Sequence, residues 1–260
     1  MIEVVVIVES RMDAVTATKL AERVLVEKID WLEPESLEHL FKWTGLESGT
    51  EHSCWKDIGD IMNRAEKEGI PKPRFLGHGK TGVLKADGAI AMKTLKLIKL
   101  LHRKKSRKIA AVLFIRDLDN QPERRQGIEQ ARIEQIDEQP RIEIVIGTAD
   151  RMREAWVLNG FSPLNVEENQ ILEQIKTKLN FHPCEEAHKL RSNSFAEPDR
   201  FRNPKVVVEQ LTGGDMSREQ QCWEETDLEI LRSRGTSTGL SEYLKEVEQR
   251  LISIFDRADL

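Results

Sequence analysis

Cysteine is scarce in this chain of 260 residues, which contains only Cys54, Cys184 and Cys222. An odd number of cysteines without paired spacing argues against a disulfide-stapled secreted scaffold and favours free thiols in a reducing compartment. Long apolar runs are absent too, because the apolar opening (residues 1–8) is only as long as a strand and charges follow it at once. We therefore expect neither a signal peptide nor a membrane span, and a cytoplasmic location.

A general excess of positive charge is also missing. The net charge is −5, which argues against a protein that binds nucleic acid through a uniformly basic surface. Residues 79–108 are an exception, since they contain ten lysines and arginines but a single acid, Asp87. Apolar residues make up 39% of the chain and charged residues 33%, a composition typical of globular proteins.

Continuous apolar runs alternate with helical patterns in the first part of the chain. Residues 1–8, 109–115 and 141–147 are predicted strands, and residues 74–76 form a weaker one. Helical spacing of apolar residues fills the intervals, at residues 11–29, within 35–68, at 88–103, at 123–138 and from 149 or 150 onward. This alternation predicts an α/β fold with a mainly parallel, Rossmann-like four-stranded sheet flanked by helices.

The pattern changes after Pro163. Helical patterns at residues 165–179, 217–234 and 240–255 replace the alternation, and residues 205–208 suit either a strand or a helix that begins after Pro204. We therefore predict one domain over residues 1–160 and a mostly helical C-terminal region over residues 161–260.

Acidic residues follow two of the predicted strands. Glu9 comes directly after the first strand, and Asp117 and Asp119 follow the strand at 109–115. Ligand sites of parallel sheets lie at the carboxyl ends of the strands, and carboxylates are preferred ligands of Mg²⁺ and Mn²⁺. The pattern predicts a Mg²⁺ or Mn²⁺ site at Glu9, Asp117 and Asp119. The alternative is that the two aspartates only cap a turn or a helix.

These motifs resemble those of the Toprim superfamily over residues 1–160. Val8-Glu9 after the first strand, and later Ile115-Arg116-Asp117-Leu118-Asp119, are similar to the Toprim signature in order and strand context. Glu9-Ser10-Arg11-Met12-Asp13 resembles the two-acid opening of OLD-like and RloB-like nucleases. Gly147-Thr148-Ala149-Asp150 and the following Glu154-Ala155-Trp156 resemble a later stretch of the same proteins.

The resemblance implies a divalent-metal-dependent nuclease, of the kind found in antiphage defence, that works with an ATPase partner. It implies catalytic roles for Glu9, Asp117, Asp119 and Glu154, and metal ligands among Glu9, Asp13, Asp117, Asp119 and Asp150. Each of the outer acids also has a structural interpretation. Asp13 suits a first-turn acid, Asp150 an N-cap and Glu154 a helix-surface charge.

The basic segment predicts a surface for nucleic-acid phosphates, next to the strand that ends in Asp117. Its candidate contacts are Lys80, Lys85, Arg103, Lys104, Lys105 and Arg107, and the alternative is a solvated helix face with a basic loop. The glycine-rich stretch 77–82 is not a P-loop, because position 74 is arginine where that motif needs glycine.

Two other functions are compatible with the sequence. One is a non-catalytic Toprim-fold subunit that holds metal and phosphate or docks an ATPase. The other is an ordinary doubly wound nucleotide-binding protein in which Asp117 and Asp119 are cap residues. DNA and RNA are both open as substrates, as are one or two metal ions and an oligomeric state.

Overall fold

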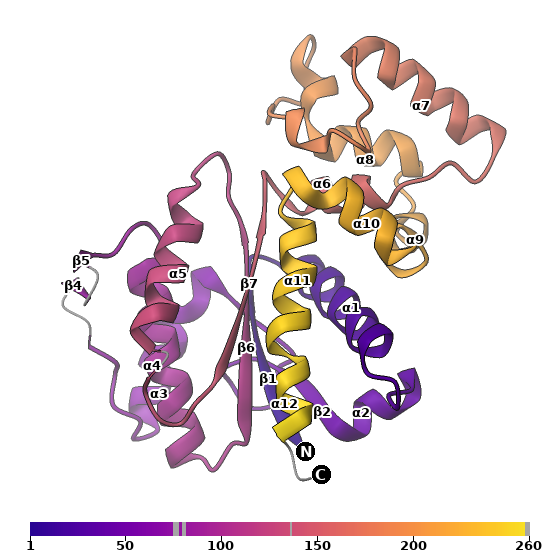
Figure 1. Cartoon of the computed structure of the whole chain (residues 1–260). Helices are drawn as coiled ribbons and strands as arrows, with labels where there is room; N and C mark the ends of the chain where they lie inside the picture. The colour runs from indigo at the N-terminus through magenta and orange to yellow at the C-terminus, as the bar shows by residue number, and fades with distance from the viewer. Residues whose placement is uncertain (75–77, 80–81, 136, 258–260) are drawn as a thin grey trace. The chain divides into compact units, whose positions relative to one another are not determined.

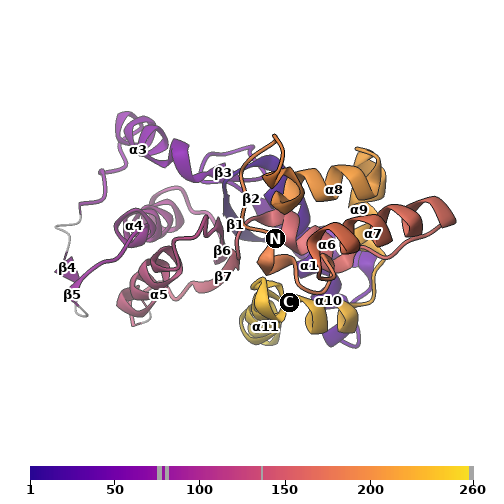
Figure 2. The same cartoon turned by 90° about the horizontal axis from the view of Figure 1, so that it is seen from above.

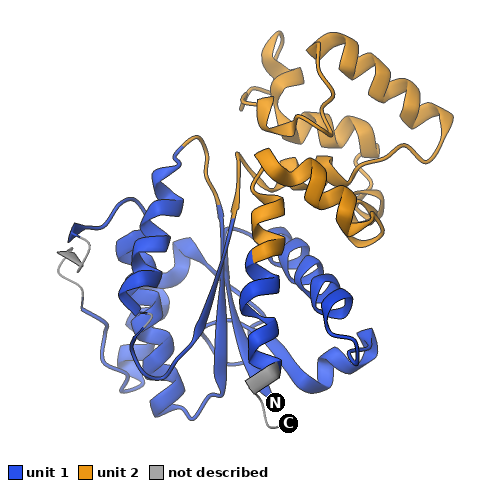
Figure 3. Ribbon diagram, viewed as in Figure 1, with its two compact units in different colours: residues 1–116, 121–147, 246–260 blue, residues 117–120, 148–245 orange. Residues whose placement is uncertain are grey.

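The computed structural model describes residues 1–74, 78–79, 82–135 and 137–257, and the chain forms two compact units (Figure 3). Unit 1 comprises residues 1–116, 121–147 and 246–260, and unit 2 comprises residues 117–120 and 148–245. The division does not follow the sequence boundary predicted near residue 160, because the end of the chain belongs to unit 1.

Unit 1 is built on a parallel sheet, which confirms the predicted α/β class. The strand order is β2-β1-β6-β7, with β3 also paired to β1, and β1 pairs in parallel with β2, β3 and β6. The strands are β1 (Ile2–Val8), β2 (Phe41–Thr44), β3 (Ser53–Cys54), β6 (Ile109–Asp117) and β7 (Glu143–Ala149). A separate antiparallel pair, β4 (His78–Gly79) and β5 (Gly82–Val83), lies outside this sheet.

The strands beside β1 differ from those expected. Residues 41–44 and 53–54 lie in a region predicted to be helical, yet they form β2 and β3. These strands are too short for their alternation to be distinguished from helical spacing, and it is pairing with β1 that fixes them. Of the predicted strand at 74–76, residues 75 and 76 lie outside the described residues, and Arg74 is not in a strand.

Helices cover both faces of the sheet in unit 1 (Figures 1 and 2). α3, α4 and α5 lie on one face, and α1 with α12 lies on the other. Alternate residues of β1 and β6, such as Val5, Ile7 and Phe114, enter the core beneath α3 and α4. The helices of this unit are α1 (Arg11–Lys28), α2 (Leu37–Leu40), α3 (Ile58–Lys67), α4 (Gly88–Lys104), α5 (Glu123–Gln135), the end of α11 (Leu240–Arg250) and α12 (Ile252–Arg257).

Unit 2 is mostly helical, as predicted for the C-terminal region. Its helix α6 is buried along most of its length, and Trp156 of α6 stacks on Tyr243 of α11 with ring centroids 5.1 Å apart. Its helices are α6 (Arg153–Gly160), α7 (Val166–Leu179), α8 (Pro204–Thr212), α9 (Met216–Glu224), α10 (Leu228–Arg234) and the first part of α11.

Helix starts and breaks in unit 2 refine the sequence prediction. α6 begins at Arg153 rather than at 149 or 150, and the predicted helix 217–234 is divided into α9 and α10. The break occurs where Asp227 caps α10 by accepting a hydrogen bond from the Glu229 amide. Residues 205–208 belong to α8, for which Asn203 is the N-cap. In the described part of the chain, no helix is both long and apolar enough to span a membrane.

Candidate functional site at the carboxyl ends of the strands

Glu9 stands where β1 leaves the core. The strand positions from Val4 to Val8 are fully buried, and the chain becomes polar at Glu9 and Ser10, immediately before α1. The Glu9 side chain is 29% exposed. The sequence prediction that Glu9 lies at the carboxyl end of the first strand is therefore confirmed.

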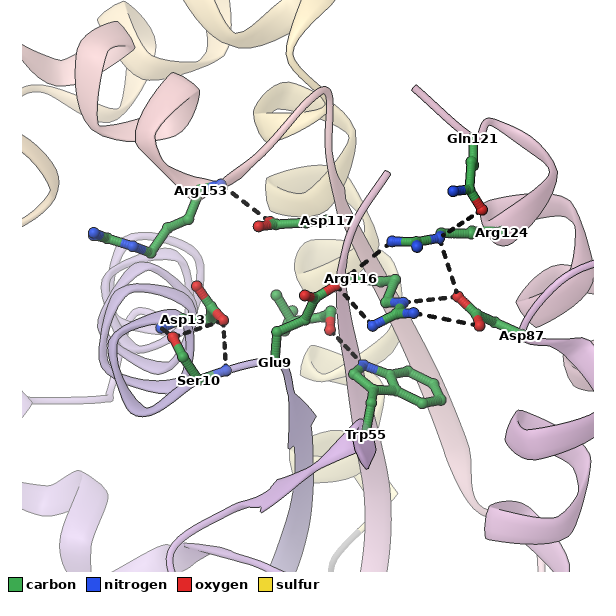
Figure 4. Close-up of polar contacts among 11 residues, drawn as sticks. Glu9, Ser10, Asp13, Trp55, Asp87, Arg116, Asp117, Gln121, Arg124 and Arg153 are labelled. Atoms are coloured by element: carbon green, nitrogen blue, oxygen red, sulfur yellow. Dashed lines mark hydrogen bonds and ion pairs between the residues drawn. The ribbon is translucent and has the colours of Figure 1, made fainter. Parts of the chain in front are cut away.

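An arginine from the adjacent strand contacts Glu9 (Figure 4). Arg116, near the end of β6, has its NH1 atom 2.7 Å from Oε1 of Glu9. Its Nε atom lies 2.7 Å from Oδ2 of Asp87. The Arg116 side chain is only 16% exposed, so these ion pairs are partly shielded from water.

Arg124 approaches the same two acids from α5. Its NH1 atom lies 3.8 Å from Oε1 of Glu9, and its Nε atom lies 3.8 Å from Oδ2 of Asp87. Asp87 occupies the N-cap position of α4, with a left-handed φ of 62°. Glu9, Asp87, Arg116 and Arg124, all in unit 1, therefore form a compact set of two carboxylates and two guanidinium groups, called here the arginine–carboxylate cluster.

Trp55 packs against Arg116 of the cluster. Its Nε1 atom donates a hydrogen bond of 2.7 Å to the Ile115 carbonyl, and its ring stacks on Phe114. The guanidinium carbon of Arg116 lies 5.6 Å from the centroid of the Trp55 ring, within reach of a cation–π interaction. The orientation of Arg116 is therefore fixed by two acids and an aromatic ring.

Asp13 has a structural role at the start of α1. Its Oδ2 atom accepts hydrogen bonds from the Ser10 amide at 2.7 Å and the Ser10 hydroxyl at 2.9 Å, and Ser10 is the N-cap. This reciprocal arrangement is a capping box. The alternative interpretation of Asp13 as a first-turn acid is confirmed, and its metal role stays a prediction.

Asp117 and Asp119 belong to unit 2. Asp117 is the last residue of β6, and its Oδ1 atom accepts a 3.0 Å hydrogen bond from the amide of Arg153, the first residue of α6. Figure 4 shows this contact between Asp117 and Arg153. The first turn of α6 also contains Glu154. Asp119 has a left-handed φ of 48°, and its amide donates to the Arg151 carbonyl.

Asp150 and Glu154 pair with arginines in unit 2. Both carboxylate oxygens of Asp150 contact Arg191, at 2.7 and 2.9 Å. Asp150 is not the N-cap of α6, a position that Met152 occupies, so the N-cap interpretation was wrong. Glu154 lies 3.7 Å from NH2 of Arg153 and is only 16% exposed, less than expected for a helix-surface charge.

Most of the predicted basic contacts lie away from Glu9. Arg107 precedes β6 and pairs with Glu3 at the start of β1, whereas Glu9 follows the end of that strand. Lys104 and Lys105, at the end of α4, contact the Gly69 carbonyl and Glu68. Arg103, in the same turn, contacts the Gln139 carbonyl. The structure does not bring these four basic residues together with Glu9.

The side chain of Arg107 is also buried and makes hydrogen bonds within unit 1. Its side chain is only 9% exposed and donates to Glu3, Thr44 and the carbonyls of Gly45 and Leu46. This burial is incompatible with the predicted contact to nucleic acid. A buried acid 104 positions earlier in the chain neutralises this arginine, and a single sequence gives no signal for such a pairing.

Lys85 is a predicted basic residue that lies close in sequence to Asp87 of the arginine–carboxylate cluster. It is exposed, lies two positions before Asp87, and its amide donates a 2.8 Å hydrogen bond to Gln130 of α5. Lys80 lies outside the described residues.

The predicted ligands match a hard divalent cation in donor chemistry, because all are carboxylate oxygens. Glu9 and Asp13 belong to unit 1, whereas Asp117, Asp119 and Asp150 belong to unit 2. Within the described residues, no three acid, histidine or cysteine side chains are grouped closely enough to form a metal site. A cation at Oε1 of Glu9 has to displace the guanidinium of Arg116.

Three residues of the arginine–carboxylate cluster were missed from the sequence. Asp87 is the only acid of the basic segment, and Arg116 directly precedes Asp117. Arg124 lies in the first turn of α5, where the helix dipole disfavours a cation unless an acid offsets it. These three sequence features could have indicated that the residues belong to the site.

A parallel sheet with polar residues at the carboxyl ends of its strands defines a Rossmann-like α/β protein. No family model matches the chain, and no curated protein or solved structure is significantly similar to it.

Proposed function

We propose that the protein is a Mg²⁺- or Mn²⁺-dependent phosphodiesterase of the Toprim type that cleaves DNA or RNA. The observation that carries the proposal is the placement of acids on adjacent strands. Glu9 follows β1 directly, and Asp117 is the last residue of β6, the strand that pairs with β1 in parallel. Ligands of such sheets bind beyond the carboxyl ends of the strands.

In this proposal, Glu9, Asp117 and Asp119 would hold the cation, and Asp13, Asp150 and Glu154 would complete or orient the site. Mg²⁺ or Mn²⁺ would supply Lewis-acid polarisation of a phosphoryl oxygen. A carboxylate oxygen of Glu9 would accept the proton that the attacking water loses. Asp117 is oriented by the Arg153 amide, which fixes one of its two oxygens.

An ATPase partner is part of the proposal. Arg74 stands where a P-loop needs glycine, so the glycine-rich stretch of this chain does not supply nucleotide hydrolysis. The Toprim resemblance instead suggests a nuclease subunit of an antiphage-defence system, in which another protein hydrolyses ATP.

Cleavage of labelled single-stranded and double-stranded DNA and RNA, with Mn²⁺ or with EDTA, tests the proposal. We expect cleavage of at least one substrate with Mn²⁺, none with EDTA, and a loss of at least about 100-fold in Glu9→Gln and Asp119→Asn. Glu66→Gln changes an exposed acid on α3 and is the control, with unchanged activity expected. Activity that survives in Glu9→Gln and Asp119→Asn contradicts the assignment.

A specific observation favours a second candidate, a non-catalytic subunit that holds metal and phosphate. Three predicted site acids already have protein partners: Glu9 pairs with Arg116, Asp13 caps α1, and Asp117 accepts the Arg153 amide. This candidate predicts that the protein binds Mn²⁺ and oligonucleotides but cleaves none of the four substrates.

A further inference from the structure

The arginine–carboxylate cluster is balanced in charge, with two cations and two anions. Each arginine faces both acids, since Arg116 contacts Glu9 and Asp87 at 2.7 Å and Arg124 approaches both at 3.8 Å (Figure 4). No carboxylate of the cluster belongs to one arginine alone. Removing one acid therefore takes one carboxylate contact from both guanidinium groups.

The two acids are held differently. Asp87 is fixed at the N-cap of α4 and contacts two nitrogens of Arg116, Nε at 2.7 Å and NH2 at 3.4 Å. Glu9 contacts Nη1 of Arg116 at 2.7 Å, and it is the more exposed acid, at 29% against 18% for Asp87. Glu9 is thus the acid that a solvent cation reaches more easily.

A metal ion at Glu9 changes the charge balance. The carboxylate then binds the cation, and Asp87 is the acid of the cluster that still pairs with Arg116 and Arg124. Guanidinium groups are planar forks of N–H donors that match phosphate oxygens, and charge-assisted hydrogen bonds to phosphate are among the strongest in proteins. Because Trp55 and Asp87 still fix Arg116, its NH1 donor stays in place for a new anion.

We propose that Arg116 and Arg124 form a phosphate-binding pair that exchanges Glu9 for a phosphodiester group of the nucleic-acid substrate when Glu9 binds the metal ion. The exchange rests on the proposed function, since it requires a cation at Glu9. In this exchange, Asp87 is the residue that positions the arginine pair. Arg116 and Arg124, and not the distant Arg103 and Arg107, are then the phosphate contacts nearest to Glu9.

Calorimetric titration with Mn²⁺ tests the first half of the exchange. Arg116→Gln removes the guanidinium that a metal has to displace, so we expect it to bind Mn²⁺ about tenfold more tightly than the wild type. Arg125→Gln, which removes the neighbouring arginine of α5 that pairs with Glu129, is the matched control and leaves Mn²⁺ affinity unchanged.

Fluorescence anisotropy with fluorescein-labelled DNA and RNA oligonucleotides, in Ca²⁺ to prevent cleavage, tests the second half. Arg116→Gln and Arg124→Gln each weaken binding about tenfold, and Arg125→Gln does not. The expected effects of Arg116→Gln on the two ligands have opposite signs. A variant that merely folds poorly loses affinity for both.

The outcomes separate the two proposals. A wild-type protein that binds no Mn²⁺ contradicts the proposed function and removes the basis of the exchange. A wild type that binds Mn²⁺, with an Arg116→Gln variant that gains no Mn²⁺ affinity or keeps full oligonucleotide affinity, overturns the exchange alone.

Discussion

Arginines in this chain differ sharply in what they do, and neighbouring charges decide the difference. Arg107 precedes β6 and is buried against Glu3, whereas Arg116 lies near the carboxyl end of that strand and pairs with the partly exposed Glu9. The first pair joins β1 to the segment that precedes β6, and Arg107 also donates to the carbonyls of Gly45 and Leu46 after β2. The second is placed to change partners.

The Glu3–Arg107 pair is predicted to stabilise the fold. Glu3→Gln removes a charge that is 12% exposed and leaves Arg107 buried without its acid, so we expect a loss of about 3 kcal/mol in the free energy of unfolding. Urea unfolding measures this loss. Glu68→Gln is the control, because Glu68 is 63% exposed and its partner Lys105 is 43% exposed, and a loss of at most about 1 kcal/mol is expected there.

The same pair has a defined pH dependence. Burial raises the pKa of Glu3, but the hydrogen bond and charge of Arg107, with help from Lys42, outweigh burial and hold the pKa below its ordinary value of 4.5. The stabilisation is therefore complete above pH 4.5 and is lost as the pH falls through the lowered pKa. The stability difference between wild type and Glu3→Gln should shrink in acid, and a difference that grows there contradicts this account.

At the scale of single elements, α1 allows the capping and metal roles of Asp13 to be separated. Ser10→Ala and Asp13→Asn each disrupt the capping box, and we expect each to lower stability by about 1 kcal/mol. If Asp13 also supports the metal, only Asp13→Asn weakens Mn²⁺ binding, by about tenfold. Equal Mn²⁺ affinity in both variants assigns Asp13 to capping alone. Urea unfolding and calorimetry provide the two readings.

The crossing of α4 and α5 is set by a glycine next to the arginine–carboxylate cluster. A Cβ atom on Gly127 of α5 would lie 2.1 Å from the Ala86 carbonyl oxygen and 2.7 Å from the Gly88 nitrogen. These backbone atoms flank Asp87. The glycine therefore permits the close approach that sets Asp87 beside Arg124, one helical turn away from Gly127.

Gly127→Ala is predicted to destabilise the protein although it raises helix propensity. The propensity gain is at most about 1 kcal/mol, whereas overpacking against backbone costs about 1 to 3 kcal/mol. Gly59→Ala in α3 is the control, because its Cβ meets nothing within 4 Å, and a small gain is expected there. Denaturation midpoints that rise in both variants contradict the close crossing.

At the scale of the whole molecule, long strands and helices were predicted from the sequence more reliably than short strands. The apolar runs of β1, β6 and β7 and the helices α1, α4 and α7 were predicted because each extends over several turns or strand positions. β2 and β3 were not, since two to four residues carry too little periodicity and depend on pairing with β1.

The candidate site was predicted in part for the same reason. Glu9 and Asp117 could be placed because Glu9 directly follows one long strand and Asp117 ends another. Parallel strands run in the same direction, so their carboxyl ends lie at the same end of the sheet. The Glu9–Arg116 pair joins residues 107 positions apart, and the Arg116–Asp87 pair joins residues 29 apart. Such pairings depend on strand order and helix crossing, which a single sequence does not reveal.

Mn²⁺ titration by calorimetry of the wild type, Glu9→Gln and Glu66→Gln tests the central claim most directly. We predict that the wild type and Glu66→Gln bind Mn²⁺ with the same affinity and that Glu9→Gln loses at least about tenfold, because the proposal makes Glu9, at the end of β1, a charged oxygen ligand of the metal ion. Equal binding by all three proteins, or no binding by any of them, would contradict a metal site at the carboxyl ends of these strands.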